Sequence, residues 1–127
     1  MQQKHVYEYA VVRVVPVVER EEFVNAGVIL FCKNERFIRM KYRLREDRIL
    51  ALMPDADLEE IRRNLEAFCR IAAGEKDGGP IASLDEAERF RWLTAVRSAS
   101  IQTSRPHPGV SVDLEKTVDT LFSELAG

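Results

Sequence analysis

The sequence predicts an α+β fold, in which a small antiparallel β-meander of three strands, with an optional short fourth strand, packs against three to four helices. Two observations predict this fold class. Between residues 6 and 44 the apolar residues alternate with a period of two, which is typical of strands, and from residue 45 onward the period becomes about 3.6, which is typical of helices. The length of 127 residues suits one hydrophobic core, so we expect a single domain over residues 1–127.

Three segments have the composition of β-strands. Residues 6–15 are rich in Val and Tyr and stop at Pro16, residues 27–33 are apolar on both sides, and residues 37–44 alternate after a turn at residues 34–35. Residues 101–104 form the optional fourth strand. Residues 105–109 contain two prolines, which lack an amide donor, and they predict an irregular loop.

Four later segments have helical periodicity: residues 45–53, 58–72, 83–96 and 114–125. Asp55 or Asp57 can cap the second segment, and Ser83 with Glu86 three residues later predicts a capping box at the start of the third. The last segment has an apolar stripe made of Leu114, Val118, Leu121, Phe122 and Leu125. We expect these helices to cover one face of the sheet.

Composition excludes several classes of protein. Nineteen Lys and Arg against 21 Asp and Glu give a net charge of -2, which provides no bulk attraction for nucleic acid or for an anionic membrane. The longest apolar run, residues 26–32, is far shorter than the about 20 residues of a membrane helix. The N-terminus lacks the apolar core of a signal peptide, so we expect a cytoplasmic protein with its two cysteines, Cys32 and Cys69, reduced and buried.

The strand at residues 37–44 has one basic face, with Phe37, Arg39, Lys41 and Arg43 on it. Such a face is typical of a nucleic-acid platform, but also of a solvated sheet face whose charges complement acidic helices. We favour the second interpretation and expect no nucleic-acid binding at physiological salt, because the glycine and aromatic pattern of RNA-binding sheets is missing.

His107 lies between two prolines beside Arg105, where a stiff loop makes it a candidate for contact with an anion. No second His and no Cys stands at a spacing that supports a catalytic triad or a metal site. We therefore predict no catalytic residue, no bound metal and no cofactor.

Arg13 interrupts a valine-rich strand, and a guanidinium that is buried there needs a partner. Glu22 or Glu8 is the candidate counter-ion, and Asn25 is a further polar neighbour once the chain reverses after Pro16. This cluster is either a structural tie at a turn, which we favour, or part of a ligand pocket.

Four stretches of the chain resemble a family of short bacterial proteins catalogued as a domain of unknown function, number three thousand and thirty-seven. The most specific stretch is Glu-Phe-Val-Asn-x-Gly-Val, and the stretches are YEYAVVR at residues 7–13, EFVNAGVIL at 22–30, PDADL at 54–58 and IQTSRP at 101–106. The resemblance carries no established activity, cofactor or catalytic residue. It implies a regulatory or partner role, because genes of this family neighbour genes for kinases similar to the HipA toxin.

The sequence thus favours a non-enzymatic interaction or regulatory module whose partner is another protein, with a HipA-like kinase as the candidate, and it leaves a homo-oligomer open. The alternative is a small anion-binding protein or enzyme that places basic and polar side chains around a phosphate or carboxylate. The residues for that alternative are Arg13, Asn25, Arg39, Arg105 and His107. It requires these residues to converge in one cleft.

Overall fold

The structure is a computed structural model that describes residues 3–97 and 99–127. Within these residues the strands are β1 (His5–Val14), β2 (Val24–Cys32), β3 (Phe37–Tyr42), β4 (Ile101–Thr103) and β5 (His107–Ser111). The α-helices are α1 (Glu46–Leu52), α2 (Leu58–Ala73), α3 (Glu86–Leu93) and α4 (Leu114–Leu125). The predicted α+β class is therefore confirmed, and so is the short fourth strand.

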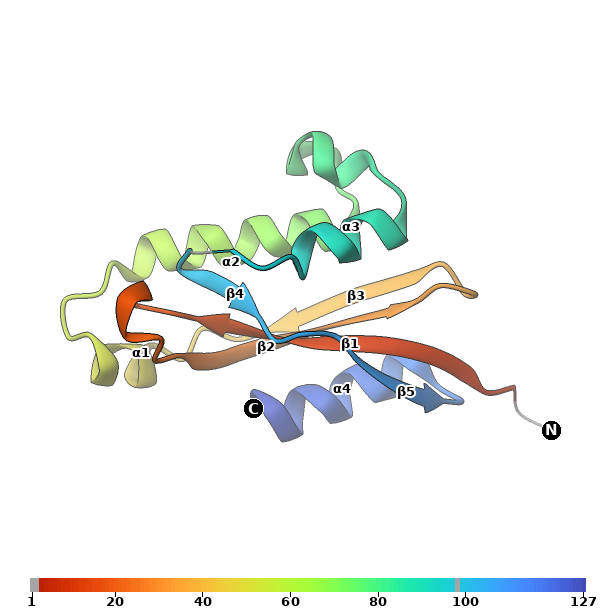
Figure 1. The fold of residues 1–127 in the computed structure, drawn as a ribbon, viewed down its shortest axis with the longest axis horizontal. Coiled ribbons are helices and arrows are strands. Elements are labelled where there is room, and N and C mark those ends of the chain that lie inside the picture. The colour runs from red at the N-terminus through yellow and green to blue at the C-terminus, as the bar shows by residue number, and fades with distance from the viewer. Residues whose placement is uncertain (1–2, 98) are drawn as a thin grey trace.

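All strand pairs of the sheet are antiparallel, in the order β3, β2, β1, β4, and β5 also pairs with β1. The first three strands form the predicted meander. Strands β4 and β5 lie one after the other along the outer edge of β1, where β4 pairs with the end of β1 and β5 with its beginning (Figure 1). Strand β1 is thus a central strand, with β2 on one side and the late strands β4 and β5 on the other.

Strand β5 corrects the expectation of an irregular loop at residues 105–109. Pro108 stands opposite Glu8 in a regular register, and β5 lies at the edge of the sheet. An edge strand tolerates a proline because only one side of its backbone needs to donate hydrogen bonds. The prolines therefore restrict β5 to an edge and do not prevent it from forming.

Ser104 lies in the gap between the end of β4 and the start of β5, and it continues the pairing with β1 there. Its amide donates to the carbonyl of Val11 at 2.9 Å, and its hydroxyl oxygen accepts a hydrogen bond from the amide of Val11 at 2.9 Å. The side chain thus takes the place of a backbone partner, and the buried amide of Val11 stays satisfied across the break in the edge.

A β-bulge displaces the register of β2 against β1. Gly27 stands opposite Val12 and Asn25 opposite Arg13, so Ala26 is the extra residue. A side chain at Gly27 would collide with the backbone carbonyl of Lys41 on β3, which explains why glycine stands at the bulge. The bulge places Asn25 beside Arg13 on the same face of the sheet.

The helices cover both faces of the sheet, which corrects the expectation that they cover one. Figure 1 shows α2 and α3 on one side of the sheet and α4 on the other. Strand β2 has alternating residues in the two core clusters: Ile29 packs under α2 and α3, whereas Val28 and Leu30 pack under α4. A strand that is apolar on both sides needs a cover on both sides.

The two cysteines differ in burial. Cys32 is completely buried under α4, as expected, but Cys69 on α2 is only half-buried, because it lies at the rim of the core cluster and not inside it. Burial, together with the negative charge of Glu75, raises the pKa of the Cys69 thiol.

We expect a thiol reagent to label Cys69 slowly in the native protein and to label Cys32 only after unfolding. Since the raised pKa lowers the thiolate fraction of Cys69, its labelling rate should reach its plateau at a higher pH than that of a free thiol. Mass spectrometry of the labelled peptides over a pH series measures both rates. Rapid native labelling of Cys32 would contradict its position beneath α4.

Candidate functional site

The basic face of β3 is matched by acidic residues of α4. Arg39 lies 2.9 Å from the carboxylate of Glu115, and Lys41 lies 2.9 Å from that of Asp119. These exposed pairs contribute little stability. They agree with the interpretation favoured from the sequence, in which acidic helix residues complement the basic face of the strand. The absence of nucleic-acid binding stays a prediction.

His107 and Arg105 lie away from Arg13. His107 stands opposite Tyr9 in the β5–β1 pair, with 5.4 Å between the ring centroids. Tyr9 precedes Arg13 by four positions on β1, a separation of roughly 13 Å along a strand. Arg105 is exposed in the short segment between β4 and β5. The structure therefore does not bring Arg39, Arg105 and His107 into one cleft with Arg13.

Glu22 is not the counter-ion of Arg13, which corrects that candidate pairing. A short 3-10 helix, Val18–Arg20, is followed by Glu21 in the left-handed region at φ 58°, and this turn brings Glu22 to the guanidinium of Arg20. The other candidate, Glu8, is an odd number of positions from Arg13 on the same strand and faces the opposite side of the sheet.

The structure does place Asn25 next to Arg13. Asn25 donates from Nδ2 to the carbonyl oxygen of Leu125 at 3.1 Å and so ties the end of α4 to the bulge. Its Oδ1 and the Nε of Arg13 are both buried, and neither has a hydrogen-bond partner in the described part of the chain. Asn25 thus makes the contact that joins the bulge to α4, and the Nε of Arg13 takes no part in it.

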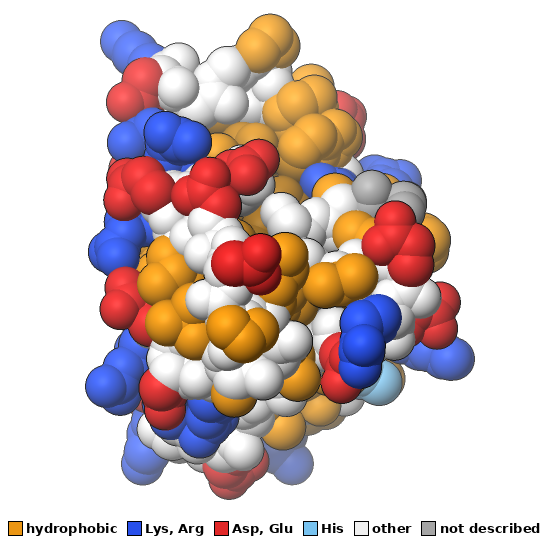
Figure 2. All heavy atoms as spheres, turned by 90° about the vertical axis from the view of Figure 1, so that its left-hand side faces the viewer, with side chains coloured by type: hydrophobic (Ala, Val, Ile, Leu, Met, Phe, Trp, Pro, Cys, Tyr) orange, Lys and Arg blue, Asp and Glu red, His pale blue; other side chains and the backbone are white. Residues whose placement is uncertain are grey.

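Arg13 lines a hollow of about 560 Å³ at the corner where β1 ends and β4 begins. The guanidinium lies over the ring of Phe23, with 4.1 Å from its central carbon to the ring centroid. Figure 2 views this end of the molecule, where hydrophobic side chains reach the surface between acidic and basic ones. The lining residues are Arg13, Val15, Val18, Glu21, Phe23, Val96, Arg97 and Gln102.

Arg97 also lines the hollow, and contacts within its own chain hold its side chain in place. Its guanidinium carbon lies 4.5 Å from the ring centroid of Trp92 and 5.1 Å from that of Phe68. It also donates to the backbone carbonyls of Trp92 and Ala95. Burial lowers the pKa of Arg97, but an arginine stays charged at neutral pH.

Sequence reasoning found Arg13 but missed Phe23, Val96 and Arg97. Phe23 is 45% exposed and Val96 is fully exposed, although both are apolar. The local sequence pattern does not identify these residues as part of a site. The hollow is lined by residues of β1 and of the segment after α3, which lies more than eighty positions later. Only the pairing of β4 with β1 brings the two together.

A family described as "Protein of unknown function (DUF3037)" matches residues 9–126. The chain belongs to this family. The match covers every residue that lines the hollow and all four α-helices. Searches among curated proteins and solved structures gave no match.

Two absences complete the description of this family member. Within residues 3–97 and 99–127, no three His, Cys, Asp or Glu side chains gather as the ligands of a metal ion would. Among the helices of the same residues, none combines the length and the apolar character that crossing a bilayer requires.

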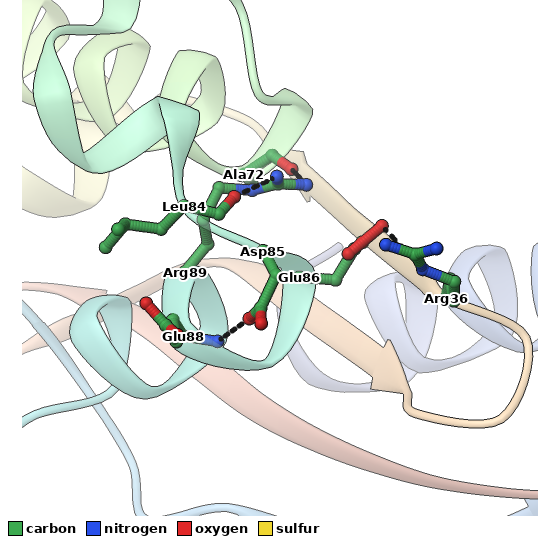
Figure 3. Close-up of polar contacts among 7 residues, drawn as sticks. All are labelled: Arg36, Ala72, Leu84, Asp85, Glu86, Glu88 and Arg89. Carbon is green, nitrogen blue, oxygen red and sulfur yellow. Dashed lines mark hydrogen bonds and ion pairs between the residues drawn. The ribbon is translucent and has the colours of Figure 1, made fainter.

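An arginine that supports the fold has different surroundings from Arg13. Arg89 on α3 donates from Nη1 to the carbonyl of Leu84 at 2.7 Å and from Nη2 to that of Ala72 at 3.4 Å (Figure 3). It thereby joins α3 to the end of α2, where Gly74 ends the helix. The Nε atoms of Arg13 and Arg89 are both buried without a partner, but within the described residues only Arg89 of the two has bonds from its Nη atoms to backbone carbonyls.

We expect Arg89→Ala to destabilise the protein more than Arg13→Ala. Loss of Arg89 leaves two half-buried carbonyls unpaired, at a cost of about 1–3 kcal/mol. Loss of Arg13 removes its stacking on Phe23, worth about 0.5–2 kcal/mol at a half-buried site, but it also removes a buried Nε without a partner, which offsets part of that loss. Chemical denaturation of both variants and the wild type measures the difference. If Arg13→Ala lost about 3 kcal/mol or more, the arginine would be a paired structural charge and not a free group of the hollow.

Proposed function

We propose that this protein is a non-enzymatic interaction module that acts in the cytoplasm and binds another protein at the hollow beside Arg13. The observation that carries this proposal is a combination at one corner of the sheet: exposed apolar side chains beside two arginines that form no ion pair within the described residues. The resemblance described above implies a HipA-like kinase as the partner to test first.

The composition of the hollow supports a protein as the ligand. Phe23 is 45% exposed and Val96 fully exposed, so both have apolar surface to bury on binding. Aromatic residues and arginines are the residues that most often dominate the binding energy of protein interfaces. A partner that covers Phe23 and Val96 would also remove water from around Arg13, which strengthens its electrostatic interactions.

The geometry gives less support to the alternative of an anion-binding enzyme. That alternative required Arg13, Asn25, Arg39, Arg105 and His107 around one ligand. Only Arg13 and Asn25 are neighbours, and Arg39 is paired with Glu115. An enzyme also needs a general acid or base near the bound group, and among the described residues that line the hollow the one candidate is Glu21, which is exposed.

Co-purification tests the proposal. The protein is co-expressed with the HipA-like kinase of the same organism, and the amount of kinase retained on the tagged protein is measured. We expect retention by the wild type and at least tenfold less retention by Val96→Glu, which adds a charge to the apolar wall of the hollow.

The matched control is Val112→Glu, because Val112 is also an exposed valine but lies near the other end of β1. We expect this variant to retain the kinase as the wild type does. Equal retention by all three proteins would place the interface elsewhere, and no retention by any of them would reject the kinase as partner.

A further inference from the structure

We propose that the hollow recognises a carboxylate, carried by an Asp or Glu side chain of the partner beside an apolar side chain, and that Arg13 is the group that binds it. This inference rests on the proposed function, and it adds the chemistry by which the partner is chosen.

The charges of the lining set the charge of the ligand. Arg13, Arg97 and Glu21 are the charged residues of the lining, so it carries a net charge of +1. In the described ranges 3–97 and 99–127, neither arginine forms an ion pair with a carboxylate of its own chain. One carboxylate balances this charge, whereas a phosphate group carries about -1.5 to -2 at neutral pH and would be left undercompensated next to Glu21.

The two arginines have different roles. Arg97 donates hydrogen bonds to the backbone carbonyls of Trp92 and Ala95, and the rings of Trp92 and Phe68 lie against its guanidinium. It contributes a fixed positive field. The Nε of Arg13 is buried and has no hydrogen-bond partner within the described part of the chain, and stacking on Phe23 holds the plane of the guanidinium. A guanidinium that is held in this way loses little entropy when it forms a bidentate pair with a carboxylate.

The apolar part of the lining determines what must stand next to that carboxylate. In the lining, Val15 is buried and Val18 is half-buried, whereas Phe23 and Val96 are exposed. An acidic residue alone would leave these side chains in water. A partner segment with an apolar residue within one or two positions of the acidic residue covers both parts of the hollow.

Peptide selection tests this chemistry without knowledge of the partner. A library of random peptides of about 12 residues, displayed on phage, is selected on the immobilised full-length protein and counter-selected on Val96→Glu. The affinities of the selected synthetic peptides are then measured by fluorescence anisotropy. We expect an Asp or Glu next to an apolar residue in the selected sequences, and at least tenfold weaker binding when it is replaced by Asn or Gln.

Variants of the protein complete the test. We expect Arg13→Leu to weaken binding of the selected peptides at least tenfold, Arg13→Lys to weaken it less, and Val112→Glu to leave it unchanged. Melting temperatures confirm that each variant is folded, and Arg13→Gln, which removes the charge but keeps a polar side chain, gives the answer if Arg13→Leu does not fold.

Three outcomes would overturn the inference: no selected peptide, peptides without an acidic residue, or peptides whose affinity is unchanged in Arg13→Leu. Displacement of the peptides by millimolar inorganic phosphate but not by acetate would assign the hollow to phosphate instead. Each of these leaves the co-purification result with the kinase intact, so failure of the carboxylate chemistry is distinguishable from failure of the interaction module.

Discussion

Truncation after Val112, which removes α4, is expected to unfold the protein. Leu114 and Val118 of this helix are buried against Val28, Leu30 and Cys32, which are completely inaccessible to solvent. Each fully buried apolar side chain contributes about 1.5–3 kcal/mol, and the uncovered strand loses a similar burial. The total is comparable to the whole stability of a typical domain, about 5–15 kcal/mol.

Circular dichroism and chemical denaturation of the truncated protein measure this effect. The control is the full-length double variant Glu115→Ala, Asp119→Ala, which breaks the two exposed ion pairs of α4 and keeps the helix. Surface ion pairs contribute about 0–1 kcal/mol each, so this variant should unfold cooperatively near the wild-type midpoint. If the truncated protein kept its melting temperature, α4 would be an appendage and not the third layer of the fold.

Ile29→Ala and Leu30→Ala are each expected to lower the free energy of unfolding by about 2–5 kcal/mol. The two residues are neighbours on β2 and point to opposite faces, and both are completely buried. Ile29 packs in the core beneath α2 and α3, whereas Leu30 packs beneath α4. Comparable losses at adjacent positions are the signature of a strand that is buried on both faces.

Val6→Ala provides the control for these two variants. Val6 is also an aliphatic residue of a central strand, but it is 63% exposed, so its truncation should cost no more than about 0.5 kcal/mol. Chemical denaturation of the three variants gives the comparison. A loss at Leu30 as small as that at Val6 would mean that α4 does not cover this face in solution.

Much of the fold could be predicted because its signals are local. The change of period after residue 44, the stop at Pro16 and the glycine that ends α2 all act over a few residues, and each element that they predict is present. The double-sided burial of residues 27–33 was also visible in the sequence. It already implied cover on both faces, but the pattern alone does not tell which helix goes to which side.

The predictions were wrong or incomplete where the structure depends on the edge of the sheet, as in β5, or on residues distant in the sequence, as around Arg13. Pro108 argues against a strand only if both sides of its backbone must pair, and the position of β5 at the edge removes that requirement. Arg13 was recognisable as an anomaly in a valine-rich strand. Its surroundings were not, because Val96 and Arg97 reach it only through the pairing of β4 with β1.

The position of β1 also affects how the chain is made. β1 leaves the ribosome before the synthesis of residues 101–111, which pair with its outer edge. Until then this valine-rich strand has an unpaired edge, which is a template for pairing with other chains. Pairing over such a sequence separation is also slow. Chains that terminate before residue 101 keep this edge unpaired, and they are therefore the ones expected to accumulate as aggregates.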